Sequence, residues 1–360
     1  MRFVKNVRFF VSVLILAVCS ALCVGSCAGV SDASPVSQTG FAFDTVVTIT
    51  IYNKDKSDVL DACFDLCEQY EALFSATRAD SEIWEINNSN GMPVLVSFET
   101  ASLIQSALLW CEKSNGSLDL TMLPIAEEWC ISEQMTRMSE NSNYEYYIPD
   151  ASRLNALLEH VNYKNVVISD ENGNVTAYDE ELSDAHSYRV QLLDTEAAID
   201  LGFIAKGYIA DKLKEFMLSQ GIESGVISLG GNILLIREKP DHSPFNIGIQ
   251  KPFGNAGEVI TTVQKTDTSV VSSGCYERYF SDSADGRIYH HIFDTTTGEP
   301  VWNGLYGVTV ICDSSLQGDA LSTYCYILGL DEGLQFIRSL EGVEAVFVTE
   351  NYEVICSFEE

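Results

Sequence analysis

The stretch DLGFIAKGYIADKLKEFMLSQGIESGVISLGGNILLI, residues 200–236, decides the fold. It opens with a glycine-bearing loop, after which apolar residues recur at helical spacing from Ile209 to Met217, and Gly221 ends that pattern. A strand-like run follows at Gly225 to Leu229, and Gly230-Gly231 makes a tight turn. A loop, a helix and a turned strand in one short stretch predict a mixed fold.

The rest of the chain repeats this mixture of hairpins and isolated helices. Alternation of Val, Ile and Thr predicts that a strand over residues 41–52 opens the domain. Further elements are predicted as helices over residues 60–73 and 100–114, strands over 245–249, 258–263, 308–311 and 345–348, and a helix pair before the last strand. The sequence therefore predicts an α+β fold, with antiparallel-rich sheets flanked by helices.

Two further predictions concern local structure. Residues 133–147 are polar and lack periodicity, which predicts a surface loop. Val166 to Ile168 and Val175 to Ala177 flank Glu171-Asn172-Gly173-Asn174, which is the pattern of a β-hairpin.

Length and charge limit the classes of function. With 360 residues and 46% hydrophobic content, the chain can bury the core of one large domain or of two closely packed ones. Its net charge of −31 argues against binding nucleic acid, because a phosphate backbone demands a basic surface.

The N-terminus has the pattern of an export signal. Arg2, Lys5 and Arg8 precede an apolar stretch from Phe9 to Val24, so residues 1–26 are predicted to be a signal peptide. Val24-Gly25-Ser26-Cys27 resembles the bacterial lipobox, in which the cysteine is lipidated, and an uncleaved single-span anchor is the alternative. We expect a tether over residues 27–40, a folded domain over 41–360, and attachment through Cys27 to the extracytoplasmic face of the cell membrane.

Eight cysteines lie beyond the lipobox. None of them has C-x-x-C spacing, so evidence for zinc or redox chemistry is weak. We expect most of them to be buried as small apolar side chains, and one oxidised pair remains an alternative.

Three segments carry groups suited to catalysis. Asp319 and Thr323 are four residues apart, hence on one face of a helix, and offer hard oxygen ligands that suit Mg²⁺; a helix cap is the bland alternative. His291 and Asp294, after His290, place an imidazole and a carboxylate at a strand-to-turn junction, although a packed histidine is equally compatible with the pattern.

The third segment is the loop that opens the first quoted stretch. It holds Asp200, Lys206 and two glycines just before a helix, where backbone N–H groups favour anions such as phosphate.

Together these segments resemble the ApbE family of FAD:protein FMN transferases across almost the whole exported region. The resemblance is carried, in order, by Asp80-Ser81-Glu82 with Ile86-Asn87, Asp119-Leu120-Thr121 with Pro124 and Trp129, Asp200-Leu201-Gly202 with Ala205-Lys206-Gly207-Tyr208 and Asp211, Leu229-Gly230-Gly231-Asn232, Ser273-Gly274 with Tyr276-Glu277-Arg278, His291-Ile292 with Asp294 and Thr297-Gly298, and Asp319-Ala320-Leu321-Ser322-Thr323.

The resemblance implies a reaction and roles for particular residues. FAD would be cleaved across its pyrophosphate, FMN joined to a Ser or Thr of an exported or membrane redox protein, and AMP released. Mg²⁺ would be held by Asp319, Thr323 and the carbonyl of Phe203. His291 would be the base, and Asp294 would orient it. Contacts to FAD are implied for Asp200, Lys206, Ser117, Leu118, Asp119, Phe43, Thr77 and Ile292.

The chain departs from the family pattern at a few positions. Phe43-Asp44-Thr45 stands where Met-Gly-Thr is usual, Cys275 replaces an acid after Ser-Gly, and Thr295 replaces a common proline. These departures concern contacts to the flavin more than the reaction itself.

Three other functions fit parts of the pattern. Water could replace the acceptor hydroxyl, giving a FAD pyrophosphatase that yields FMN and AMP. A flavin-binding lipoprotein without catalysis would also use the acidic surface and the tether, and an exported scaffold would use neither the metal ligands nor the base.

Overall fold

The computed structural model describes residues 34–141, 144–281 and 286–358. Its largest element is a sheet of eight strands, all paired antiparallel, in the order β1-β2-β6-β7-β10-β13-β14-β15. The strands are β1 (Val36–Ala42), β2 (Thr45–Ile51), β6 (Gly225–Leu229), β7 (Asn232–Ile236), β10 (Ser269–Gly274), β13 (Leu305–Cys312), β14 (Glu344–Thr349) and β15 (Val354–Cys356).

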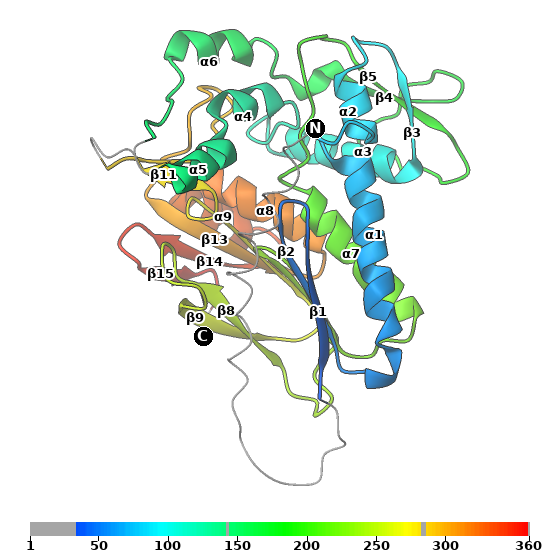
Figure 1. Ribbon diagram of the computed structural model, residues 1–360, viewed down its shortest axis with the longest axis vertical. Helices are drawn as coiled ribbons and strands as arrows, with labels where there is room; N and C mark the ends of the chain where they lie inside the picture. The colour runs from blue at the N-terminus through cyan, green and yellow to red at the C-terminus, as the bar shows by residue number, and fades with distance from the viewer. Residues whose placement is uncertain (1–33, 142–143, 282–285, 359–360) are drawn as a thin grey trace.

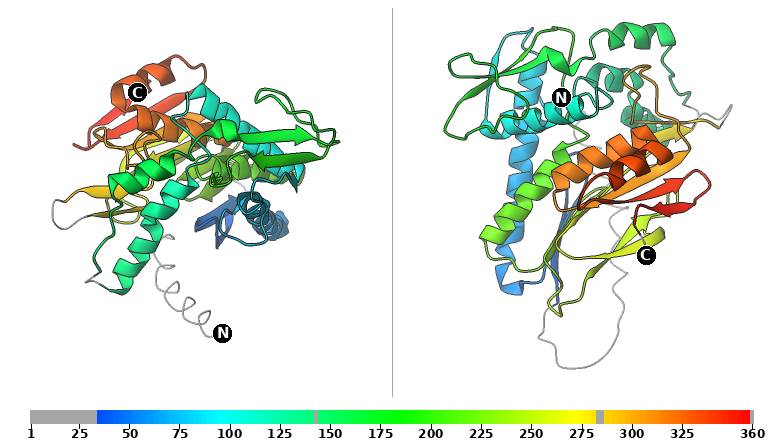
Figure 2. Two further views of the ribbon diagram at one scale, coloured as in Figure 1. Left: turned by 90° about the horizontal axis from the view of Figure 1, so that it is seen from above. Right: turned by 180° about the vertical axis from the view of Figure 1, so that it is seen from behind.

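Helices and a hairpin cover the two faces of this sheet (Figures 1 and 2). One face carries α1 (Asp58–Phe74), α7 (Ala205–Ser219), α8 (Ser315–Leu328) and α9 (Leu330–Arg338). The other face packs on the hairpin of β8 (Phe245–Gln250) and β9 (Val259–Lys265) through buried Leu235, Ile247 and Val270. Because both faces of the central strands are covered, β13 is buried along nearly its whole length.

Two smaller units lie beside the large sheet. The first is a three-stranded antiparallel sheet of β3 (Val94–Val96), β5 (Tyr188–Leu192) and β4 (Val166–Asp170), with α2 (Glu82–Asn87) and α3 (Phe98–Lys113) against it. The second contains α4 (Leu123–Trp129), α5 (Ile131–Glu140), α6 (Ala151–Leu158) and the strand pair β11 (Tyr279–Ser281) and β12 (Ile288–His290). Single-turn helices occur at η1 (Lys54–Lys56) and η2 (Tyr163–Asn165).

The predicted class, α+β with antiparallel sheets flanked by helices, is confirmed. Six of the eight cysteines beyond the lipobox are buried, which confirms the expectation that most are small apolar core residues. Within the described ranges, no helix is both long and apolar enough to cross a membrane. The signal peptide and the lipobox cysteine Cys27 fall outside the described residues.

Three local predictions were wrong. The strand predicted over residues 41–52 is β2, but a further strand, β1, precedes it and contains the end of the range predicted as tether. Residues 131–140 form the helix α5 rather than a loop. Val175 makes only an isolated bridge to Ser169, and the strand that pairs with β4 is β5.

Candidate active site

The site lies where the N-terminal end of α7 crosses the first turns of α8. Gly207 permits the crossing, because a Cβ at this position would overlap the carbonyl oxygen of Ser315. Asp211, one turn further along α7, accepts hydrogen bonds from the backbone N–H groups of Ser315 and Leu316, at 2.9 and 3.0 Å, and so caps α8. The two helices are therefore held in fixed contact at their starts.

Asp319 completes the contact in the opposite direction. Its side chain is nearly fully buried, and Oδ2 accepts a hydrogen bond of 2.9 Å from the N–H of Gly207. Oδ1 lies 3.7 Å from Nζ of Lys206. Burial raises the pKa of Asp319, and the Lys206 ammonium and the Gly207 N–H oppose that shift.

This geometry rules out Asp319 as a cap of its own helix. The N-cap of α8 is Ser314, and Asp319 is the fifth residue of that helix. The carboxylate instead faces the N-terminus of α7, where the helix dipole favours negative charge. The predicted placement of Asp319 and Thr323 on one face of a helix is confirmed, since both belong to α8.

Hydroxyl groups extend the site from Thr323 toward β10. Oγ1 of Thr323 lies 3.1 Å from Oγ of Ser273, which in turn lies 2.8 Å from Oγ of Ser322. Ser273 was quoted as part of a motif but was not assigned a role. Its position beside Thr323 makes it the third hydroxyl of the site.

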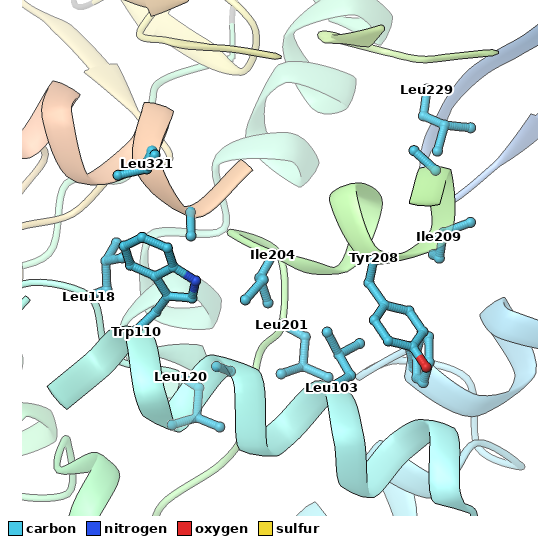
Figure 3. Close-up of a cluster of buried hydrophobic side chains, with 14 of the residues drawn as sticks. Leu103, Trp110, Leu118, Leu120, Leu201, Ile204, Tyr208, Ile209, Leu229 and Leu321 are labelled. Carbon is cyan, nitrogen blue, oxygen red and sulfur yellow. The ribbon is translucent and has the colours of Figure 1, made fainter. Parts of the chain in front are cut away.

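The loop before α7 approaches Asp319 from the other side. The N–H of Asp200 donates to the carbonyl of Leu120, and Oδ1 of Asp200 accepts from the N–H of Gly202 at 2.9 Å. Leu201 and Ile204 point into the core against α3, which anchors the loop (Figure 3). Nζ of Lys206 lies 3.3 Å from the carbonyl oxygen of Gly202, so one ammonium bridges this turn and Asp319.

The donor set fits a hard cation. Mg²⁺ prefers oxygen ligands, and the site offers three kinds. They are the buried carboxylate of Asp319, the Thr323 hydroxyl one helical turn away, and the carbonyl groups of the 202–203 turn. Within the described residues, the only ion-pair partner of this carboxylate is Lys206. No group of three or more His, Cys, Asp or Glu side chains able to hold a metal occurs in the described ranges. That result is compatible with the predicted set, because only Asp319 in it belongs to those residue types.

His291 is held by the strand pair β11–β12. Its Nδ1 lies 3.3 Å from the carbonyl oxygen of Arg278, which assigns the proton to Nδ1 and leaves Nε2 as an acceptor. Burial, with His290 and Arg278 nearby, lowers the pKa of His291 to about 3. The ring is therefore neutral at neutral pH, and its Nε2 can accept a hydrogen bond from a hydroxyl group.

Asp294 does not orient this ring through the contacts in the structure. Its Oδ1 accepts from the N–H and the hydroxyl of Thr296, at 2.7 and 2.6 Å, and so closes the turn after β12. The carbonyl of Arg278 takes the place that we predicted for Asp294.

The upstream residues 117–119 pack beside this turn. The Thr295 hydroxyl donates to the carbonyl of Gly116, which joins the two loops. Asp119 has both oxygens occupied, by the N–H and hydroxyl of Thr121 and by the N–H of Tyr163, and Leu118 is buried. These contacts assign Asp119 and Leu118 structural roles, whereas Ser117 is only half-buried.

The remaining predicted residues lie at different depths. Phe43 is at the tip of the β1–β2 hairpin with φ of 54°, and the adjacent Val46 carbonyl accepts from Gly230, which brings the tip to the Gly230-Gly231 turn. Ile292 is buried in the core. Thr77 is exposed in the loop after α1, and its hydroxyl lies 3.3 Å from that of Ser75, with no contact to Asp319.

Sequence reasoning left Arg278 and Glu277 without roles, although their motif was quoted. Neither side chain makes a hydrogen bond or an ion pair within the described residues. Arg278 nevertheless interacts electrostatically with Asp200, Glu277 and His291. A half-buried guanidinium without a partner is a signal for phosphate binding that the motif alone did not give.

Two cavities lie away from these residues. They have volumes of about 460 and 560 Å³, share Thr266 in their linings, and include none of the predicted site residues. Both are open hollows on the surface. The candidate site is therefore identified by its buried ionisable residues and not by the volume of a cavity.

Several known proteins are similar to this chain. A curated protein of Klebsiella pneumoniae named FAD:protein FMN transferase is 32% identical over 91% of this chain and 93% of its own length, and one of Treponema pallidum with the same name is 29% identical over 94% and 90%. The crystal structure of the ApbE protein from Thermotoga maritima has a TM-score of 0.76 at 29% identity, covering 89% of this chain and 96% of that one. The sequence model of the ApbE family matches residues 43–347, and the chain belongs to this family.

Proposed function

We propose that the protein is a Mg²⁺-dependent FAD:protein FMN transferase. It moves FMN from FAD to a Ser or Thr hydroxyl of an exported or membrane redox protein and releases AMP. The names of its relatives support flavin transfer. The observation that carries the proposal is the convergence of buried Asp319, Lys206 and the N-terminus of α7 beside a neutral His291 and Arg278, whose guanidinium has no partner among the described residues.

Binding of FAD uses the positive groups of the site. The side chains of Lys206 and Arg278 supply the positive charge that attracts a pyrophosphate. Asp319, Thr323 and the Phe203 carbonyl would hold Mg²⁺, which would neutralise charge on the phosphates. These residues would hold the pyrophosphate in position for in-line attack by the acceptor hydroxyl.

The transfer step forms one bond, breaks one bond and moves one proton. The acceptor oxygen forms a bond to the phosphorus of the FMN half, and the bond from that phosphorus to the oxygen of AMP breaks. The hydroxyl proton passes to Nε2 of His291. The Arg278 carbonyl keeps the proton on Nδ1, so the ring offers Nε2 to the hydroxyl.

The test is incubation of the protein with FAD, Mg²⁺ and an exported redox protein. We expect flavin fluorescence to stay with the acceptor through denaturing electrophoresis, and its mass to rise by one FMN. Asp319→Ala and His291→Asn should abolish the signal, and chelation of Mg²⁺ should do the same. Release of free FMN and AMP without a labelled acceptor would instead establish the pyrophosphatase, and FAD that stays intact with bound metal would establish a flavin carrier.

We also propose that a lipid on Cys27 holds the protein at the extracytoplasmic face of the membrane. The lipobox-like sequence supports this, and the first strand starts only nine residues after that cysteine. Fractionation of cells that express the wild type or Cys27→Ala tests it. The variant should leave the membrane fraction, and its retention there would favour an uncleaved anchor.

A further inference from the structure

Glu277 is an acid in the site that the proposed reaction does not use. It follows Tyr276 in the segment between β10 and β11 and is exposed, and its carboxylate makes no hydrogen bond or ion pair in the described part of the chain. An acid without a partner, beside a site that binds an anion, is unfavourable unless it has a function there.

The glycine turn before β7 fixes where this carboxylate lies. A Cβ placed on Gly231 would lie 2.5 Å from Oε1 of Glu277 and 2.9 Å from the carbonyl oxygen of Ser272. The absence of a side chain at Gly231 therefore makes room for the carboxylate. The carboxylate therefore lies against the backbone of the Gly230-Gly231 turn.

The charges around Glu277 are those of the site. Lys206 and Arg278 attract it and Asp319 repels it. Glu277 therefore adds its carboxylate to those of Asp319 and Asp200, close to the place where the pyrophosphate must bind. Their repulsion of the phosphates opposes the attraction by Lys206 and Arg278.

We propose that Glu277 makes FAD binding depend on the divalent cation. Without a cation, the charge of Glu277 weakens the attraction of the site for the pyrophosphate. A cation at Asp319 and Thr323 offsets the charges of these carboxylates, so metal and FAD bind together. Glu277 acts through charge and is not a ligand in the set of Asp319, Thr323 and Phe203. This inference rests on the proposed function for the identity of the ligands.

Linkage gives the inference a quantitative form. The factor by which Mg²⁺ tightens FAD binding equals the factor by which FAD tightens Mg²⁺ binding. Removing one repelling charge should raise FAD affinity in the absence of metal and change it little in its presence. The coupling factor should therefore fall, by about tenfold if Glu277 supplies a typical share of such coupling.

The experiment measures FAD binding by the change in flavin fluorescence, in EDTA and in Mg²⁺, without any acceptor. A His291→Asn background prevents turnover, and Glu277→Gln is added to it. We expect the Kd in EDTA to fall about tenfold while the Kd in Mg²⁺ changes less than about twofold. Glu341→Gln, which removes one charge from an exposed turn, should leave both values unchanged.

Other outcomes overturn the inference. Equal weakening of FAD binding in EDTA and in Mg²⁺ would mean that Glu277 binds a neutral group of FAD. An unchanged coupling factor, or no effect of Mg²⁺ on the parent, would remove the role altogether. Because no acceptor is present, a failure of transfer with the coupling intact would refute the proposed function alone.

Discussion

At the scale of single residues, the site depends on ionisable groups whose burial disfavours their charged form. Asp319 is the clearest case, because its carboxylate is buried and its pKa is raised, yet it stays beside only one ammonium and one N–H. Such a residue favours binding of a cation and not the stability of the empty protein. Function and stability should therefore respond in opposite directions when its charge is removed.

We expect Asp319→Asn to reduce FMN transfer by about 100-fold or more, because the variant lacks the charge that we propose to hold the cation. The amide oxygen can still accept from Gly207, and a buried charge disappears, so the free energy of unfolding should stay within about 1 kcal/mol or rise. Denaturant unfolding and labelling of an acceptor measure the two effects. A variant that loses both activity and stability would mean that the carboxylate supports the fold.

His290 contributes to the site by holding its neighbour. Its Nδ1 accepts from the N–H of Ile292 and its Nε2 donates to the carbonyl of Val301, so the fully buried ring fixes the chain on both sides of His291. Burial lowers the pKa of His290 to about 4. The ring must stay neutral to accept from Ile292.

This gives stability a defined pH dependence. The pKa of His290 is lower in the folded than in the unfolded state, so its stabilising effect is complete above about pH 6.5 and is lost as the pH falls toward 4, by about 3 kcal/mol in total. We expect His290→Gln to be less stable than the wild type at pH 7.5, and the difference to narrow or reverse at pH 4.5. Urea unfolding at both pH values measures this, and an equal difference at both would refute it.

At the scale of elements, the errors of sequence reasoning have physical causes. α5 was missed because most of its residues are polar, although Ile131, Met135 and Met138 recur at helical spacing. Its fully buried Gln134 is also polar and donates hydrogen bonds to the carbonyls of Trp129 and Tyr147. The turn predicted at Glu171 to Asn174 exists, but the strand that pairs with β4 is β5, the next strand along the chain, and not the residues directly after the turn. Residues 175–177 follow the turn without forming a strand, so a turn pattern alone did not show which segment pairs with β4.

The helix pair at the site tests the packing directly. We expect Gly207→Ala to destabilise the fold by about 1–3 kcal/mol or more, because the new methyl group would overlap the backbone of Ser315 and force α7 from α8. It should also weaken FAD binding, since Asp319 and Lys206 lie across this contact. Thermal unfolding and FAD titration measure both effects.

Glu215→Ala on the exposed side of the same helix is the matched control, with an expected change within about 0.5 kcal/mol. If Gly207→Ala proved as mild as this control, the close approach of the two helices would not be needed.

At the scale of the whole molecule, the order of motifs along the sequence indicated which groups the site contains, and the fold shows how they meet. Asp319, Lys206 and His291 were identified from the sequence, because their motifs occur in the order typical of the ApbE family. The unpartnered state of Arg278 and Glu277, and the structural use of Asp119, depend on three-dimensional contacts. No spacing in the sequence reports such contacts.

The cysteines give a prediction for the molecule as a whole. Burial raises the pKa of the Cys63, Cys67, Cys312 and Cys325 thiols to about 12, and six of the eight described cysteines are buried. We expect an alkylating reagent at pH 8 to modify Cys130 and Cys356 in the native protein, and the other six only after unfolding. Mass spectrometry of cysteine peptides measures this, and rapid labelling of the six would show that the core opens readily.

Asp211 of α7 binds the start of α8, and Asp319 of α8 binds the start of α7; these reciprocal hydrogen bonds have a consequence for folding. Asp319 and Gly207 are separated by 112 positions, and α8 also packs on β10, which comes from an earlier part of the chain. Contacts between residues that are far apart in the sequence slow the folding of a chain. A newly made molecule therefore has no complete site until α8 has docked on α7.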